Sequence, residues 1–157
     1  MSDFMHLTEI LRPEMVWPHL KANTKPEVIR ELARFMAAND KALDEKSIGE
    51  VLMERERLGS TGIRDGIAIP HGKVPGLDRM IIACGRSESG IDFDAHDKKP
   101  THLFFVLLAP EFAAGQHLKA LARLSKLLND AGFREKLMSS KNAEEIFCNI
   151  VEEDKNN

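Results

Sequence analysis

The chain has 157 residues, a length that suits one compact domain with a substantial core. Its 43% of hydrophobic and 30% of charged residues are typical of a globular protein, and its longest apolar run, Leu103 to Ala109, is far shorter than the roughly 20 residues of a membrane-spanning helix. The net charge of −3 and the lack of a long basic run argue against nucleic-acid binding. We therefore expect no membrane insertion and no nucleic-acid partner.

The N-terminal residues 1–6 lack the basic stretch and the long apolar core of a secretory signal, so a cytoplasmic location is expected. The two cysteines, Cys84 and Cys148, are far apart and each lies among apolar neighbours. This setting is typical of reduced thiols in a protein core, and no C-x-x-C motif indicates a metal or redox site.

Two amphipathic helices are predicted in the first third of the chain. Thr24 precedes Lys-Pro-Glu, a cap followed by an early proline and an acidic first turn, and apolar residues then recur at helical spacing up to about Asn39. Asp44 caps a second helix that continues to about Arg57 and ends at Gly59.

Several β-prone runs follow. The short run 67–69 comes after a glycine-rich segment, and two longer apolar runs cover residues 80–85 and 102–108. The second of these is continuous enough to be a buried central strand. Residues 91–94 alternate in polarity and predict a half-exposed edge.

The last third of the chain is predicted to be mainly helical. A long helix is expected from Gly115 and a last one from Asn142, while the polar residues 152–157 are expected to fray, leaving a core of about 7–151 within one domain of 1–157. Helices before and after a central group of strands predict a sheet covered by helices. The long helix is expected to pack its apolar face against the core and not to form a groove for a partner; this face comprises Leu118, Leu121, Ala122, Leu124, Ser125 and Leu128.

The sharpest local feature is a histidine at the end of a short strand, His71, with Pro70 before it and Gly72 after it. Proline fixes the backbone, glycine allows close approach, and a neutral imidazole is a nucleophile at pH 7. A structural histidine in a turn is the alternative. The preceding loop, Gly59 to Gly66, favours the functional interpretation, because successive backbone amides in turns bind anions such as a phosphoryl group.

Two nucleotide motifs are excluded. The run from Gly66 to Lys73 has one residue too many between its glycines for a P-loop, and Val74 stands where Ser or Thr binds magnesium. The glycines from 59 to 66 lack the G-x-G-x-x-G spacing of dinucleotide folds.

The runs Arg55-Glu56, Gly59-Ser60-Thr61-Gly62-Ile63 and Gly66-Ile67-Ala68-Ile69-Pro70-His71-Gly72, with Gln116-His117-Leu118 further on, resemble the enzyme IIA domains of the bacterial phosphoenolpyruvate-dependent phosphotransferase system, of the fructose, mannitol and nitrogen-regulatory type. The resemblance covers nearly the whole chain. It implies an α/β fold in which one mixed central β-sheet is flanked by helices on both faces. It also implies that His71 accepts a phosphoryl group on Nε2 from phosphorylated HPr or an HPr-like carrier, with His117 and Arg55 beside it.

These residue types suit that chemistry. His71 must be neutral to attack phosphorus, while Arg55 and His117 can donate to the phosphoryl oxygens. The loop is expected to add donors, and the predicted phosphate-binding residues are Ser60, Thr61, Gly62, Gly66 and Gly72. No cofactor is implied, and no metal is expected, because a zinc site on the two histidines would lack further ligands. In isolation, Arg55 could equally be a solvated partner of a neighbouring glutamate, and His117 a plain helix residue.

The glycine loop and the histidine motif look most like the nitrogen-regulatory branch. Regulation of a partner such as a transporter or kinase is therefore the first hypothesis, sugar uptake through a IIB domain the second, and a binding module without phosphoryl transfer the third. Arg64 departs from the family pattern, which usually has glycine there. It is either a solvated partner of Asp65 or a residue that reaches over His71 to the phosphoryl group or the docking carrier.

Overall fold

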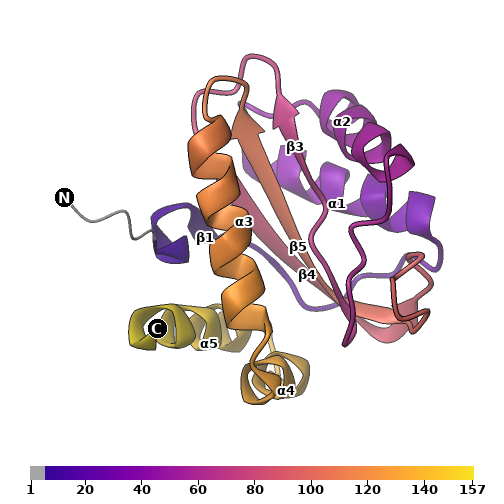
Figure 1. The fold of residues 1–157 in the computed structure, drawn as a ribbon, viewed down its shortest axis with the longest axis vertical. Helices are drawn as coiled ribbons and strands as arrows, with labels where there is room; N and C mark the ends of the chain where they lie inside the picture. Colours follow the sequence, from indigo (N-terminus) through magenta and orange to yellow (C-terminus); the bar gives the residue numbers. More distant parts are fainter. Residues whose placement is uncertain (1–5) are drawn as a thin grey trace.

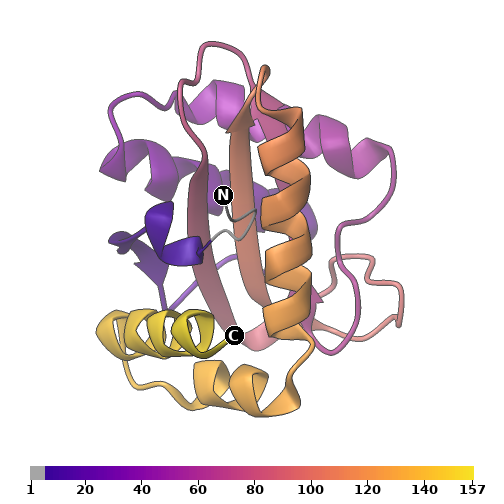
Figure 2. The same ribbon diagram turned by 60° about the vertical axis from the view of Figure 1, so that its left-hand side comes forward.

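The computed structural model describes residues 6–157, arranged as a five-stranded sheet with helices on both faces (Figures 1 and 2). Helices α1 and α2 cover one face, and α3 and α5 the other, with α4 beneath α5. Residues 1–5, which belong to the N-terminal stretch considered for a secretory signal, lie outside the described residues. The elements in chain order are η1 (Leu7–Glu9), β1 (Leu11–Trp17), α1 (Lys25–Asn39), α2 (Glu45–Arg57), β2 (Ile67–Ala68), β3 (His71–Val74), β4 (Ile81–Ile91), β5 (Thr101–Pro110), α3 (Ala114–Leu128), α4 (Ala131–Ser139) and α5 (Ala143–Asn156).

The sheet is mixed, as predicted. Its order is β1-β4-β5-β2, and β3 pairs with β5 beyond the end of β2. Strands β4 and β5 are antiparallel, whereas β1, β2 and β3 run parallel to their neighbours. Strand β5 is buried along nearly its whole length, which confirms the central strand expected from its continuous apolar run.

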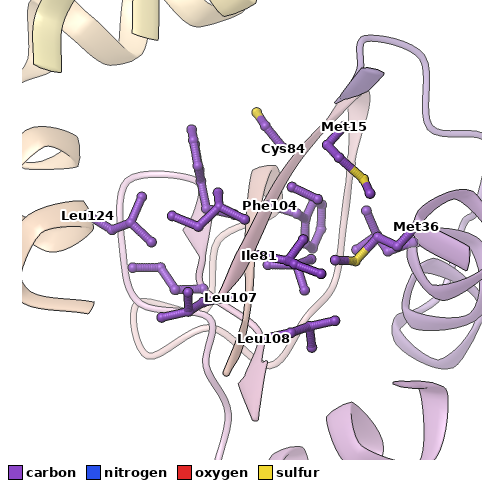
Figure 3. Packing of buried hydrophobic residues seen from close by; sticks show 14 of the residues in the cluster. Met15, Met36, Ile81, Cys84, Phe104, Leu107, Leu108 and Leu124 are labelled. Atoms are coloured by element: carbon purple, nitrogen blue, oxygen red, sulfur yellow. The ribbon is translucent and has the colours of Figure 1, made fainter. Parts of the chain in front are cut away.

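Side chains from the sheet and from α1 and α3 form one apolar core (Figure 3). Phe104 and Leu108 of β5 are inaccessible to solvent, as are Met36 of α1 and Leu124 of α3. Cys84 is also fully buried, as expected, and burial raises the pKa of its thiol to about 12. This thiol is therefore unreactive at neutral pH.

The helix caps follow the sequence signals. Thr24, Asp44 and Asn142 each accept a hydrogen bond from a backbone amide in the first turn of α1, α2 and α5. Four elements were not predicted, namely η1, β1, β3 and α4. Strand β1 contains Pro13, which is tolerated because β1 is an edge strand, and α4 is a short helix capped by Asp130.

Two expectations about burial and one about a strand are wrong. Residues 91–94 alternate between buried and exposed as predicted, with Phe93 packed edge-on against Phe104 at a centroid distance of 5.3 Å. However, 92–94 form a turn and not a strand, since the Asp94 amide donates to Asp92 Oδ1 and Asp94 has a φ of +54°. Cys148 is exposed, because α5 buries Ile146 and Ile150 on its opposite face. Helix α3 is rotated relative to the prediction, so that Leu118 is 69% exposed while the buried face carries His117, Ala120, Arg123, Leu124, Leu127 and Leu128.

The C-terminal residues are ordered and not frayed. Helix α5 continues to Asn156, and the side chain of Asp154 is fully buried. Its carboxylate accepts hydrogen bonds from Arg123 Nε (3.0 Å) and Nη2 (2.8 Å) in α3 and from the backbone amide of Thr8 (3.2 Å). A buried ion pair thus ties the end of the chain to α3 and to the N-terminal turn, which composition alone does not reveal.

Replacing Asp154 by alanine should strongly destabilise the fold, because it leaves the Arg123 guanidinium buried without its carboxylate. Such losses typically cost about 3–5 kcal/mol of unfolding free energy. Urea denaturation of Asp154→Ala should show a clearly lower midpoint, whereas Glu152→Ala, an exposed position on the same helix, should leave it unchanged. Equal midpoints for both variants would contradict the structural role of this pair.

Candidate functional site

His71 is the first residue of β3, where the chain leaves the loop before it and pairs with Leu107 of β5. Gly72 lies under α2 and lines the same cavity as His71. A Cβ atom at this position would come within 2.4 Å of Val51 Cγ1, so a larger residue would require the Val51 side chain or α2 to shift. The glycine of the histidine motif therefore favours close packing of α2 beside His71.

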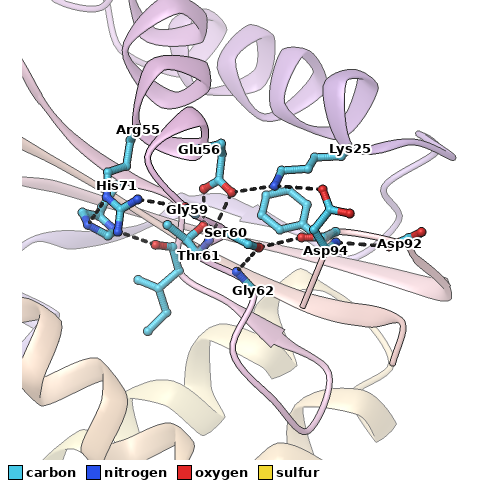
Figure 4. A network of polar contacts seen from close by, with 12 residues as sticks. Lys25, Arg55, Glu56, Gly59, Ser60, Thr61, Gly62, His71, Asp92 and Asp94 are labelled. Atoms are coloured by element: carbon cyan, nitrogen blue, oxygen red, sulfur yellow. Dashed lines mark hydrogen bonds and ion pairs between the residues drawn. The ribbon is translucent and has the colours of Figure 1, made fainter. Parts of the chain in front are cut away.

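Arg55 is placed by the geometry of α2. Ile48, Leu52 and Glu56 follow one another at helical spacing on the buried face, and Val51 and Arg55 form the neighbouring stripe that faces β3. The guanidinium donates from Nε to His71 Nε2 at 3.3 Å and from Nη1 to the Gly59 carbonyl at 2.9 Å (Figure 4). The structure therefore brings the predicted Arg55 and His71 into direct contact.

The hydrogen bonds of His71 determine its tautomer. Its Nδ1 lies 2.7 Å from the carbonyl oxygen of Ile69, which can only accept, so Nδ1 carries the proton. Its Nε2 faces the Arg55 Nε–H, which can only donate, so Nε2 presents a lone pair. A neutral imidazole with a free electron pair on Nε2 is the form required for nucleophilic attack.

Burial lowers the pKa of His71 below its ordinary value, because the charged imidazolium loses hydration. The Ile69 carbonyl opposes this shift, and the Arg55 charge adds to it. The result favours the neutral ring at pH 7.

His117 lies beside His71, with ring centroids 5.4 Å apart and the two planes nearly perpendicular. It belongs to the first turn of α3, whose N-cap residue Ala113 supplies no side-chain cap. Burial, followed by the charges of His71 and Lys73, lowers its pKa. Its Nε2 is buried, and no described residue offers it a hydrogen bond. An oxygen bound near His71 would satisfy this nitrogen.

The two histidines and Arg55 open on a cavity of about 740 Å³ between α2, β3 and the start of α3. Sequence reasoning missed the other lining residues, among them Lys73, Leu58 and Leu118. Lys73 adds a second positive charge, while Leu58 and Leu118, 81% and 69% exposed, form apolar edges. The signal for Lys73 was its place directly after the histidine motif. The two leucines could not be recognised, because their exposure depends on the rotation of α2 and α3.

The structure corrects the prediction of a phosphate-binding loop. Ser60, Thr61, Gly62 and Gly66 do not line the cavity. The Thr61 amide donates to Glu56 Oε1 (3.1 Å) and the Gly62 amide to Ser60 Oγ (3.0 Å), so both donors are already used. Gly66 lies against His102 at the other end of β5. Of the predicted loop residues, Gly72 alone lies at the cavity.

Arg64 does not reach over His71. Its side chain is 69% exposed and lies 3.9 Å from Asp65, as the simpler of the two interpretations expects. It borders a separate cavity together with Ser125 at the far end of α3. His117 and Ser125 are about 12 Å apart along that helix, which separates Arg64 from His71.

The residues that the structure describes contain no group of three or more His, Cys, Asp or Glu side chains placed to hold a metal ion. Among the same residues, no helix is long and apolar enough to cross a membrane.

Comparisons with known proteins identify the family of this chain. The family model described as "Phosphoenolpyruvate-dependent sugar phosphotransferase system, EIIA 2" matches residues 9–153. A nitrogen regulatory protein of Bradyrhizobium diazoefficiens is 43% identical over 91% of this chain and 93% of its own length. The crystal structure of the nitrogen regulatory protein IIA-Ntr of Neisseria meningitidis superimposes with a TM-score of 0.85, at 34% identity, over 92% of this chain and 98% of that one. The fructose-specific EIIABC component of Bacillus subtilis is 36% identical over 96% of this chain, which spans 24% of that protein.

The chain is therefore a phosphotransferase-system domain of the IIA kind and belongs to the EIIA type-2 family. Within that family it resembles the nitrogen regulatory proteins along almost their entire length.

Both site histidines should titrate below their ordinary pKa of about 6.5 in the folded protein. Because the unfolded chain then binds protons more readily, the two histidines stabilise the fold above pH 6.5, and this contribution is lost as the pH falls through their folded pKa values. Nitrogen-detected NMR titration should find His71 as the Nδ1–H tautomer at pH 7. A midpoint at or above 6.5 for His71 would contradict the assigned environment.

Proposed function

We propose that the protein is a phosphocarrier whose His71 accepts a phosphoryl group on Nε2 from phosphorylated HPr or an HPr-like carrier. The observation that carries this proposal is the pair of hydrogen bonds that fixes the ring, since the Ile69 carbonyl holds the proton on Nδ1 and the Nε2 lone pair accepts from Arg55, which lines the same cavity. Family membership supports the same chemistry.

No proton has to leave His71 during the phosphoryl transfer. The Nε2 lone pair forms a bond to phosphorus while the bond between phosphorus and the carrier's histidine breaks, and the carrier's imidazole leaves with its electron pair. The His71 ring gains positive charge, which the Ile69 carbonyl stabilises through the hydrogen bond from Nδ1 (2.7 Å).

Three neighbours suit the charge on the transferring phosphoryl group. Arg55 must exchange its hydrogen bond to Nε2 for one to a phosphoryl oxygen when the new bond forms, and it offers a permanent charge for this purpose. The unpartnered Nε2 of His117 can donate to a second oxygen when it carries the ring proton, and the uncapped first turn of α3 adds a positive field. Lys73 at the cavity adds a further cation.

The apolar rim fits a protein donor. Leu58 and Leu118 flank the cavity, and Phe112, 80% exposed, lies two residues before α3. Exposed large apolar side chains around a polar centre are typical of a docking surface. We therefore place the contact with the carrier on this rim.

The histidines should differ in what their loss does to transfer. His71→Ala should take up no phosphoryl group from a phosphorylated carrier, whereas His117→Ala should be modified on His71 but about 10²–10³ times more slowly, because one preorganised donor is lost. Intact-mass measurement and single-turnover kinetics report both effects. His19→Ala, an exposed histidine away from the cavity, serves as the control. An acid-labile phosphoryl group on His71→Ala would refute the assignment of the acceptor.

We further propose that phosphorylation of His71 regulates partner proteins such as a transporter or kinase. The similarity to nitrogen regulatory proteins over almost the full length of both chains supports this role. A phosphoryl group adds nearly two negative charges at one point of an apolar surface, which changes the partners that can dock there. Sugar uptake is the second candidate, since fructose-specific components are 36% and 35% identical to this chain.

The two roles differ in where the phosphoryl group goes next. For regulation, the phosphorylated protein should keep its phosphoryl group in the presence of a fructose-type IIB domain, and affinity capture with wild type and His71→Glu should recover different partners. Rapid discharge to the IIB domain, together with identical partner sets, would favour uptake.

A further inference from the structure

Behind the cavity, a buried ion pair joins the start of α1 to the end of α2. Lys25 Nζ lies 2.9 Å from Glu56 Oε1, and the side chains are only 15% and 3% exposed. We propose that Lys25, Glu56 and Thr61 form a positioning unit that holds Arg55 against His71. This inference rests on the proposed phosphoryl transfer and concerns residues that do not touch the reacting atoms.

Helix stability does not explain this pair. Lys25 is the first residue of α1, where the helix dipole disfavours a positive charge, and Glu56 lies in the last turn of α2, where it disfavours a negative one. Burying both charges adds a desolvation cost. Both residues are thus poorly placed for their own helices and well placed for each other.

Glu56 holds the loop that follows α2 by accepting two hydrogen bonds from Thr61 (Figure 4). Its Oε1 accepts from the Thr61 amide at 3.1 Å, and its Oε2 accepts from the Thr61 hydroxyl. The closed loop contains Gly59, whose backbone has a φ of +143° and whose carbonyl accepts from Arg55 Nη1. The guanidinium is therefore held between the Gly59 carbonyl on one side and His71 Nε2 on the other. Movement of the loop would release the first of these contacts.

Lys25 fastens the same loop to the segment after β4. Its ammonium lies 4.7 Å from the centre of the Phe93 ring and 3.4 Å from Asp94 Oδ2. Ser60 Oγ donates to the Phe93 carbonyl at 2.7 Å, so the loop and this segment are joined twice. Lys25 thus connects α1, α2 and the turn at Phe93. It does so beside the Glu56 carboxylate, which accepts two hydrogen bonds from Thr61 in the loop.

Glu56→Gln tests the unit, because it keeps the side-chain size and an acceptor oxygen while removing the charge that Lys25 binds. Since a misplacement of about 1 Å can cost about 10²-fold, transfer to His71 should slow by about 10²-fold. Lys25→Met, which keeps an apolar side chain over Phe93, should slow transfer to His71 by a similar factor. This variant provides the test if Glu56→Gln folds poorly. In an Arg55→Met background, Glu56→Gln should have no further effect, because the unit acts through Arg55.

The pKa of His71 distinguishes positioning from simple electrostatics. Arg55 lowers this pKa more than Glu56 raises it. If Glu56→Gln releases Arg55, the His71 pKa should rise, and the NMR signal of the Arg55 Nε–H should lose its hydrogen-bonded shift. If Arg55 stays in place, the pKa should fall, which would overturn the proposal. This titration needs no carrier, so it gives a result even if His71 proves not to accept phosphate.

Asp40→Asn is the matched control. This carboxylate is also buried and paired with arginines, but it lies at the opposite end of α1 from Lys25. The variant should lose stability while the transfer rate and the His71 pKa stay as in the wild type. A wild-type rate for both Glu56→Gln and Lys25→Met, or an equal slowing by Glu56→Gln with and without Arg55, would overturn the positioning role.

Discussion

The close packing of α2 on β3 is the constraint on which the site depends. A Cβ atom at Gly72 would come within 2.4 Å of Val51 Cγ1, and one turn further along α2 this close approach places Arg55 within hydrogen-bond distance of His71. A larger residue at Gly72 would require the Val51 side chain or the helix to shift. The pairing of β3 with β5 fixes the position of His71 in the cavity wall, since His71 and Gly72 pair with Leu107 and Leu108 in the most buried strand of the sheet.

That packing explains how a histidine stays neutral next to a permanent cation. Burial and Arg55 both lower the pKa of His71, while the Ile69 carbonyl decides which nitrogen keeps the proton. In the free protein, Arg55 protects the lone pair by donating to it. In the phosphoryl transfer proposed above, the same donor would already be aimed at the place where negative charge arrives, so little reorganisation would be needed.

Much of this architecture could be predicted from sequence because it depends on local signals. The caps at Thr24, Asp44 and Asn142 and the continuous apolar run of β5 are of this kind. The grouping of Arg55, His71 and His117 came from family motifs and not from periodicity. The failures involve tertiary contacts: Asp154 is polar in sequence yet buried by Arg123, and the rotation of α3 that exposes Leu118 depends on how that helix meets the sheet.

The glycine loop shows why a correct motif can still suggest the wrong role. Glycines and small polar residues before a histidine favour an anion site, and here the amides of Thr61 and Gly62 are instead used by Glu56 and Ser60. The loop instead holds Arg55 through the Gly59 carbonyl, so in the phosphoryl transfer proposed above its contribution would be indirect. The contacts of this loop with Glu56 and Phe93 favour a constant geometry around His71, so under the proposed regulation a partner would detect the charge of the phosphoryl group and not a rearranged backbone.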